Sequence, residues 1–553
     1  MRNELKVRLL LTLLLLLIAI APLFACTSFL AGKNATADGA TMITYAADSH
    51  VLYGELYRQP AADHPKGSMR EIREWDTNKH LGYIPEVSHT YSVIGNMNEK
   101  QVTITESTWG GREELVDTTG IMDYGSLIYV ALQRASSARQ AIKIMTTLVE
   151  KYGYYSSGES FSIADPNEVW IMEMIGKGCK EKGAVWVAIR IPDDCIAGHA
   201  NHSRIHKIPF ADKKNCMYSP DVVSFARKQG YYTGSDADFS FSRAYAEYDF
   251  GALRGCDARV WAFYRHFADD IDRYLPWING EKGAEVMPLY VKPNRKLTVA
   301  DFKAAMRDHF EGTPFDMTND IGAGPWKVPY RYRPMTFKVD DVEYTNERAT
   351  ATQQTGFSLV AQMRGSLPDA IGGVLWFGVD DANTSVYLPM YCSMDIVPYS
   401  YAVGNGDLLT FSWDAAFWVN NVVANYAYTR YSMMIGDIRK VQQQIETSLE
   451  SNQTSVEAEA LRLFNESPEK AAEFLNDYSC SRAADATAKY QQLAQFLIVK
   501  YLDGNMKCEE NGKFNRTEDG YPASPKFPGY DERYYRSIVN DAGERLRVKT
   551  PQL

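Results

Sequence analysis

Cys26-Thr27-Ser28-Phe29-Leu30-Ala31-Gly32, then Lys33-Asn34-Ala35-Thr36-Ala37-Asp38-Gly39, then Thr41-Met42-Ile43-Thr44-Tyr45-Ala46-Ala47-Asp48, is the stretch of sequence that decides the fold. Two runs of apolar and β-branched residues flank a turn rich in Asn, Asp and Gly. This pattern predicts a strand, a loop and a second strand. Cys26 would therefore stand at the very start of a β-strand.

Residues 1–25 have the layout of a secretory signal peptide. A basic start is followed by an apolar run from Leu9 to Phe24 and by the small residue Ala25, directly before Cys26. The run is shorter than the roughly 20 residues that a membrane-spanning helix needs. We therefore expect a signal peptidase to remove residues 1–25 and the protein to be exported, to the periplasm or to the outside of the cell.

The composition limits the classes of partner. The chain has 553 residues, a formal net charge of −10 and a pI near 5.6. A surface that binds nucleic acid needs clustered Lys and Arg, so we expect no nucleic-acid partner. The eight cysteines are irregularly spaced and include no CxxC pair, so neither a disulfide scaffold nor a metal site is predicted. We expect small-molecule or peptide substrates and no cofactor.

The rest of the chain alternates between strand and helix patterns. Apolar residues at helical spacing predict an amphipathic helix over 137–151. Strands are predicted at 91–95, 101–105, 160–164, 169–174, 185–189, 373–378 and 385–388. Several strands, a helix and then several more strands are typical of an α+β fold.

The chain becomes helical and charged from Ala415 to about Asp503, with a polar break predicted at 451–455. A tail rich in Pro, Gly and Tyr follows. We therefore divide the chain into a signal peptide (1–25), a catalytic domain (26–414) and a helical C-terminal subdomain with its tail (415–553).

A cysteine at a cleavage point has two chemical interpretations. It can be the lipid-attachment site of a lipoprotein, or it can be a nucleophile whose own α-amino group acts as base. An α-amine with a pKa of roughly 7.7–8.0 can accept the thiol proton, whereas an acylated amine cannot. Lipoproteins usually continue with a flexible polar tether, but here an apolar strand begins at once. This favours the nucleophile.

The stretch from Cys26 to Ala40, ending at 45–48, resembles the start of the dipeptidase A family. That family belongs with the secernins and near the choloylglycine hydrolases among the N-terminal-nucleophile (Ntn) hydrolases. Further similar segments follow in the expected order at 95–100, 106–112, 199–201, 258–261 and 376–380, so the resemblance covers nearly the whole mature chain. It implies an αββα four-layer sandwich, here with a helical C-terminal extension.

The resemblance also implies roles for single residues. The position of Cys26 resembles that of the family's nucleophile, which forms a thioester acyl-enzyme that water then hydrolyses. Asp48 matches the aspartate that holds the α-amine; from the local sequence alone it would be read as an exposed turn carboxylate. Asn201 matches a donor to the oxyanion, the alternative being a capping Asn.

Arg259 resembles an arginine near the nucleophile, the alternative being an arginine on a helix surface. Where relatives carry Arg-Asn before the aspartate, this chain has Tyr45-Ala46. A cation is therefore missing from that position, and we expect Arg259 to supply it alone.

A dipeptidase also has to bind the substrate's ammonium group, which calls for a carboxylate in the cleft. Glu106 or Glu173 are the candidates, although a carboxylate in an alternating strand is usually partnered or faces solvent. Thr108 lies in a segment close to the oxyanion region of related enzymes. We therefore expect Thr108, Glu106 and Glu173 to be substrate-binding residues.

The leading hypothesis is an exported, metal-independent dipeptidase that acts on dipeptides or short peptides, as a monomer or a homo-oligomer. One alternative is a non-peptide N-acyl amidase of the choloylglycine-hydrolase type, since pocket shape decides which amide such a site accepts. The other is a lipid-anchored binding protein that uses Cys26 only for attachment. A dipeptide cleft should contain charged anchors, whereas an acyl-amide cleft should be mainly apolar.

We predict that the mature protein begins with a free, unmodified Cys26. Intact-mass and N-terminal analysis of protein exported by its native host measures this directly. A mass that includes diacylglycerol and an acylated amine would contradict the prediction, because an acylated amine cannot serve as a base.

Overall fold

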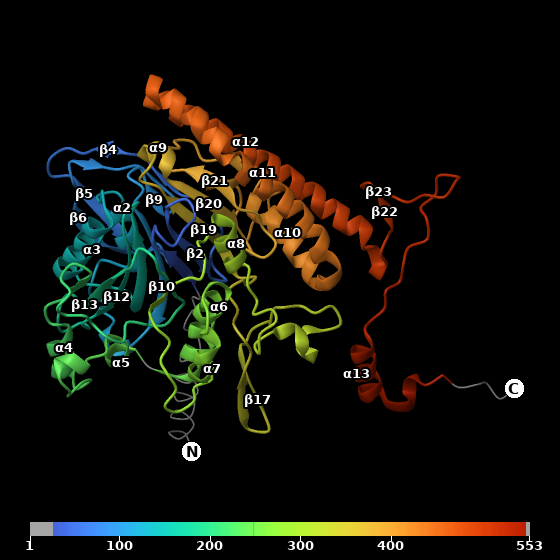
Figure 1. Cartoon of the computed structure of the whole chain (residues 1–553), viewed down its shortest axis with the longest axis horizontal. Coiled ribbons are helices and arrows are strands. Elements are labelled where there is room, and N and C mark those ends of the chain that lie inside the picture. Colours follow the sequence, from blue (N-terminus) through green and yellow to red (C-terminus); the bar gives the residue numbers. More distant parts are fainter. Residues whose placement is uncertain (1–25, 247, 549–553) are drawn as a thin grey trace, which may run out of the picture.

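The computed structural model describes residues 26–246 and 248–548 (Figure 1); the expected signal peptide lies outside these residues. In the described part of the chain, the strands form two large antiparallel sheets. One is seven-stranded, in the order β16 (Tyr290–Val291), β14 (Ile196–His199), β1 (Ser28–Ala31), β2 (Thr41–Asp48), β19 (Thr355–Met363), β20 (Val374–Val379) and β21 (Leu388–Tyr391).

The second sheet has eight strands within the same described ranges. Their order is β15 (Cys216–Tyr218), β13 (Ala184–Ile191), β12 (Val169–Gly176), β11 (Gly158–Ala164), β10 (Thr103–Gly110), β9 (Met97–Asn98), β8 (Val93–Ile94) and β3 (Arg58–Gln59). Every residue of β11 and β12 is buried, which explains why these strands read as nearly continuous apolar runs.

The two sheets face each other, and helices cover their outer faces. Strand β2 contacts β10, β11 and β12 across the interface. Helices α2 (Tyr124–Leu132) and α3 (Ala138–Tyr152) pack on the eight-stranded sheet. On the seven-stranded side lie α6 (Ala258–Phe267), α8 (Val299–Met306), α10 (Ala416–Thr429), α11 (Tyr431–Glu466) and α12 (Pro468–Lys500). The predicted α+β class is confirmed.

Smaller elements complete the fold. Two short antiparallel pairs precede β8, namely β4 (Ala62–Asp63) with β7 (His89–Thr90) and β5 (Met69–Arg73) with β6 (His80–Pro85). The others are α4 (Val222–Gln229), α5 (Phe241–Tyr245), α7 (Leu275–Ile278), α9 (Asp369–Gly372), α13 (Glu532–Ala542), and the pairs β17 (Thr336–Val339) with β18 (Val342–Thr345) and β22 (Glu509–Glu510) with β23 (Lys513–Phe514).

The predicted strand, loop and strand after Cys26 are confirmed as β1 and β2. Leu30 pairs with Ile43 in antiparallel register, and every residue of both strands is buried. Gly39, in the turn between them, has a φ of +74°, a conformation that glycine adopts without steric cost. Because β1 lies between β14 and β2, the position of Cys26 is fixed by pairing on both sides.

Most of the other predicted elements are confirmed, including the helix over 137–151 and the strands at 160–164, 169–174 and 185–189. The strand predicted at 385–388 is wrong, because β21 begins only at Leu388. Ser385 instead belongs to a turn, in which its N–H donates to the carbonyl of Asp381 at 3.0 Å.

The polar break predicted at 451–455 is also wrong. Helix α11 runs through it, since Asn452 and Ser455 bond back to carbonyls of the same helix and face solvent. The break comes at Ser467, which is extended with a φ of −163° and precedes Pro468. Proline is well suited to the first turn of a helix, so the chain restarts there as α12.

The C-terminal helices share one core with the seven-stranded sheet. Buried ion pairs join α11 to the rest of the fold: Arg364, after β19, bonds to Glu457 through two contacts of 2.6 and 2.7 Å. Arg307, after α8, meets Glu446 at 2.6 Å. Among the described residues, no helix is long and apolar enough to span a membrane. The division at 414/415 stays a prediction.

We predict that Glu457→Gln lowers the free energy of unfolding by about 3 kcal/mol, because it leaves the buried guanidinium of Arg364 without its countercharge. The matched control is Glu459→Gln on the same helix, which removes an exposed pair with Arg462 and should cost less than about 0.5 kcal/mol. Urea unfolding of both variants measures the difference. Equal effects would show that the buried pair does not stabilise the helix layer.

Candidate active site

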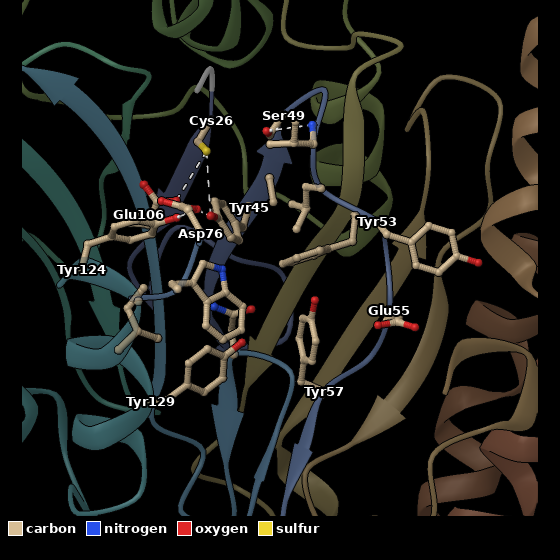
Figure 2. Close-up of a pocket in the computed structure, with 18 of the residues that line it drawn as sticks. Cys26, Tyr45, Ser49, Tyr53, Glu55, Tyr57, Asp76, Glu106, Tyr124 and Tyr129 are labelled. Carbon is tan, nitrogen blue, oxygen red and sulfur yellow. Dashed lines mark hydrogen bonds between the residues drawn. The ribbon is translucent and has the colours of Figure 1, made fainter. Parts of the chain in front are cut away.

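Cys26 lines a cavity of about 730 Å³ that also contains residues of β2, β10, α2 and the turn between β5 and β6. Figure 2 shows Cys26 at one end of this cavity, with Glu106, Asp76 and Tyr124 beside it and with Tyr57 and Tyr129 at the other end. The first residue of the predicted strand therefore stands at one end of a large cavity.

The thiol of Cys26 is buried, with the residue only 4% exposed. Its Sγ lies 3.4 Å from Glu106 Oε1 and 3.8 Å from the hydroxyl of Tyr45. Burial raises the pKa of Cys26 well above its usual value, and the negative charges of Glu106 and Asp48 raise it further. In this arrangement the sulfur is a thiol and not a thiolate.

Glu106 is the carboxylate nearest to that sulfur. Besides the thiol it accepts a hydrogen bond from the Tyr45 hydroxyl. Glu159 lies next to it, fully buried, and burial together with the charge of Glu106 holds the pKa of Glu159 well above its usual value. Burial also raises the pKa of Glu106, so Glu159 is the member of this pair whose pKa is raised more strongly. The Thr108 hydroxyl donates to Glu159 Oε2 at 2.9 Å and so helps to position these two carboxyl groups. Thr108 also lines the cavity.

Asp48 ends β2 and lines the same cavity. It is 1% exposed, so the reading of an exposed turn carboxylate is wrong. Its Oδ2 accepts a hydrogen bond from Arg348 at 2.6 Å, and its Oδ1 accepts one from the hydroxyl of Thr355 at 2.6 Å. Burial raises the pKa of Asp48, while the charge of Arg348 opposes that rise. Arg348 is thus a second arginine, besides Arg259, that acts on Asp48, and the expectation that Arg259 alone supplies the missing cation beside the thiol stays a prediction.

Arg259 is buried on α6, 1% exposed, and is not the surface arginine that its sequence context allowed. Its Nη1 donates to the carbonyl of Cys26 at 2.8 Å and to the hydroxyl of Thr27 at 2.7 Å, while its Nη2 donates to Asn201 Oδ1 at 2.9 Å. Arg259 thus ties the backbone at the start of β1 to the segment after β14.

Asn201 has a φ of +57°, and its side-chain nitrogen donates to the carbonyl of Thr108 at 2.6 Å. Neither Asn201 nor Arg259 is among the residues that line the cavity. Arg259 bonds to the carbonyl of Cys26, and Asn201 bonds to Arg259. The oxyanion role of Asn201 stays a prediction.

Glu173 is not brought to the cavity. It is fully buried on β12, where its carboxylate accepts hydrogen bonds from the Ser203 hydroxyl and the Arg204 N–H, both at 2.5 Å. These bonds fix the loop after β14, so the expectation that Glu173 binds the substrate is corrected. Of the two candidate carboxylates, Glu106 is the one that lies beside Cys26.

Sequence reasoning missed a second carboxylate, Asp76, on the turn between β5 and β6. Its Oδ1 accepts a hydrogen bond from the Tyr124 hydroxyl at 2.9 Å. Desolvation in the cavity raises the pKa of Asp76 to about 6. The turn-forming letters of Asp76-Thr77-Asn78 were the available signal, but nothing local connects them to Cys26, which lies 50 positions earlier in the chain.

The lining of the cavity is acidic. Five carboxylates line it, Asp48, Glu55, Glu74, Asp76 and Glu106, whereas Arg73 is the single Lys or Arg among its described lining residues. Within residues 26–246 and 248–548, no group of three or more His, Cys, Asp or Glu side chains is placed to hold a metal ion.

Comparison with known proteins places this site in a family. The model of peptidase family C69 matches residues 25–444. The chain belongs to this family. The matched region of C69 begins next to Cys26, contains every lining residue of the cavity, and extends into α11.

Known proteins are similar to this chain over most of their own length. A probable dipeptidase of Salmonella dublin is 28% identical over 68% of this chain and 83% of its own. A probable dipeptidase of Latilactobacillus sakei is 28% identical over 68% of this chain and 76% of its own. Dipeptidase A of Lactobacillus helveticus is 25% identical over 73% of this chain and 82% of its own.

We predict that Glu106→Gln makes Cys26 easier to alkylate. The charge of Glu106 raises the pKa of the thiol, so removing that charge lowers the pKa and increases the thiolate fraction at a given pH. The midpoint of the iodoacetamide labelling profile should move down by about one pH unit or more. Mass spectrometry reports this site by site, with the exposed Cys179 as internal control. An unchanged midpoint would contradict the electrostatic account.

Proposed function

We propose that the protein is an exported cysteine dipeptidase in which Cys26, freed by removal of residues 1–25, is the N-terminal nucleophile. The names of the C69 relatives support cleavage of dipeptides. The observation that carries the proposal is the position of Cys26: it lies two residues before β1, at one end of an acidic cavity, 3.4 Å from the carboxylate of Glu106.

The acidic lining favours a substrate with a free N-terminus. In a dipeptide the α-ammonium nitrogen is only two bonds from the carbonyl carbon that the sulfur attacks. Its counter-ion must therefore lie within a few ångströms of Cys26 Sγ; Glu106 lies 3.4 Å away, and Figure 2 shows Asp76 next to Glu106. An N-acyl amide has no such charge, and its cleft would be mainly apolar.

Removal of the leader would also solve the activation problem. In the unprocessed chain the nitrogen of Cys26 is an amide that cannot accept a proton, and burial with two nearby carboxylates keeps the sulfur protonated. A free α-amine next to the sulfur has a pKa of roughly 7.7–8.0 and can take the thiol proton near neutral pH. Asp48, held by Arg348 and Thr355, is the carboxylate that we assign to orienting the resulting ammonium.

The proposed reaction then follows in two halves. Cys26 Sγ bonds to the carbonyl carbon, the C–N bond breaks, and the α-amine of Cys26 returns the proton to the leaving amine. A thioester remains, which a water molecule hydrolyses with the same amine as base. Asn201 does not line the cavity, and one of its amide hydrogens bonds to the carbonyl of Thr108. An oxyanion role for Asn201 would use the other amide hydrogen.

The arrangement of layers supports the same proposal. An outer helical layer, two facing antiparallel sheets and a second helical layer, with the nucleophile at the start of a central strand, is what the αββα sandwich of an Ntn hydrolase requires. We propose that fold assignment for the chain, with export to the periplasm or the cell exterior and a signal peptidase as the partner in maturation.

We predict that processed protein hydrolyses dipeptides with a free N-terminus and that Cys26→Ala lowers kcat/KM by on the order of 10³-fold or more, since the nucleophile is lost. Ninhydrin or chromatographic detection of released amino acids measures the rate, and quenched-flow mass spectrometry should detect a thioester on Cys26. The matched control is Cys179→Ala, which removes an exposed thiol distant from the cavity lining.

Other outcomes would decide between the alternatives. Hydrolysis of N-acyl amides in preference to free dipeptides would replace the dipeptidase with an amidase. A Cys26→Ala variant that loses a lipid anchor but no hydrolytic activity would leave the lipid-anchored binding protein in its place.

A further inference from the structure

The turn between β5 and β6 is fastened to the first turn of α2. The N–H of Trp75 donates to Asp123 Oδ2 at 3.0 Å, and the hydroxyl of Tyr124 donates to Asp76 Oδ1 at 2.9 Å. Two consecutive residues of this turn, an indole and a carboxylate, are thus held at fixed places, and both line the cavity that contains Cys26.

Trp75 is the centre of an aromatic wall. It stacks on Tyr129 with ring centroids 4.7 Å apart and meets Tyr57 edge-on at 5.2 Å. The indole lies directly on α2 because Gly125 has no side chain there: a Cβ at Gly125 would come within 2.5 Å of Trp75. All of these residues line the cavity, and Figure 2 shows Tyr57 and Tyr129 facing it at the end away from Cys26.

The carboxylate and the aromatic wall are spaced for one substrate residue. The α-ammonium group and the side chain of an N-terminal residue branch from the same Cα, next to the carbonyl that Cys26 attacks. With the ammonium group on Asp76, at the Cys26 end of the cavity, the side chain extends along the cavity toward Trp75, Tyr57 and Tyr129. Aromatic rings pack favourably on such a wall beyond the area they bury.

We propose that Trp75 and Asp76 bind the N-terminal residue of the substrate, so that the enzyme prefers dipeptides with an aromatic residue at that position. Asp76 binds the α-ammonium group, and the wall of Trp75, Tyr57 and Tyr129 binds the side chain. This inference rests on the proposed function of Cys26, because it assigns the orientation of a dipeptide at that nucleophile.

The test uses processed full-length enzyme and compares kcat/KM for Phe-Ala and Gly-Ala. The wild type should prefer Phe-Ala by about ten-fold or more, and Trp75→Leu should reduce that ratio by about ten-fold, whereas Trp75→Phe should keep most of it. The control is Trp413→Leu, which removes an exposed tryptophan that does not line the cavity.

Asp76 is tested through binding and its pH dependence. Asp76→Asn should raise KM for Phe-Ala about ten-fold or more with a smaller change in kcat, and the control Asp63→Asn, at an exposed carboxylate, should not. Wild-type KM should rise as pH falls through about 6, where Asp76 takes up a proton, and this rise should be absent in Asp76→Asn. The charged or titratable groups facing Asp76 are Glu74 on its own turn, Asp123 directly before α2, Tyr124 on α2, and Glu106 on β10.

Each outcome bears on one of the two proposals. A processed wild type that cleaves Phe-Ala and Gly-Ala equally, with Trp75→Leu and Asp76→Asn unchanged, overturns this inference and leaves the dipeptidase intact. A wild type that cleaves neither dipeptide faster than Cys26→Ala overturns the proposed function and the inference with it. If Trp75→Leu fails to fold by circular dichroism, Tyr57→Leu removes the opposite side of the wall and must reduce the same ratio.

Discussion

Strand β1 is hydrogen-bonded on both of its edges, to β14 on one side and to β2 on the other, and the whole site depends on this pairing. Ser28 pairs with His199 and Leu30 with Ile43, and both faces of the strand are buried, so a slip by one residue would exchange the side chains packed on the two faces. Arg259 adds a second restraint by bonding to the carbonyl of Cys26 itself. Cys26 is therefore positioned largely by the backbone geometry around it.

That rigid placement puts the sulfur in an environment unfavourable to thiolate. Burial, Glu106 and Asp48 all raise the pKa of the Cys26 thiol. Arg348 forms an ion pair with Asp48. A positive charge that arises only next to the sulfur would reverse the balance, and an α-ammonium group is such a charge. Under the proposed mechanism, the carboxylates that suit the cavity to a substrate's ammonium group are thus also the groups that keep the thiol protonated before processing.

The sequence predicted those parts of the structure whose signals are local. The strand pair around Gly39, the helix after Ser137 and the burial of Cys26 in a core follow from residue patterns a few positions long. The carboxylate near the sulfur was predicted as a choice between Glu106 and Glu173, both on buried strands, and periodicity alone could not tell which strand passes the nucleophile. Arg348 and Asp76 reach the site from segments that are remote in sequence or lack any periodic pattern, so only the assembled sheets reveal them.

The pairing of β1 and β2 has a consequence for the order of events during synthesis. Strand β2 is completed on its other edge by β19, whose first residue, Thr355, comes some three hundred positions after Asp48. Strand β2 can therefore pair with β19 only after most of the chain has been synthesised, and forming a contact across so long a loop is slow because of its entropic cost. Throughout that interval the peptide bond before Cys26 is accessible to the signal peptidase that we propose, whereas in the finished fold the cysteine is 4% exposed. The topology would thus time the proposed maturation, with the cut preceding the burial of the new terminus.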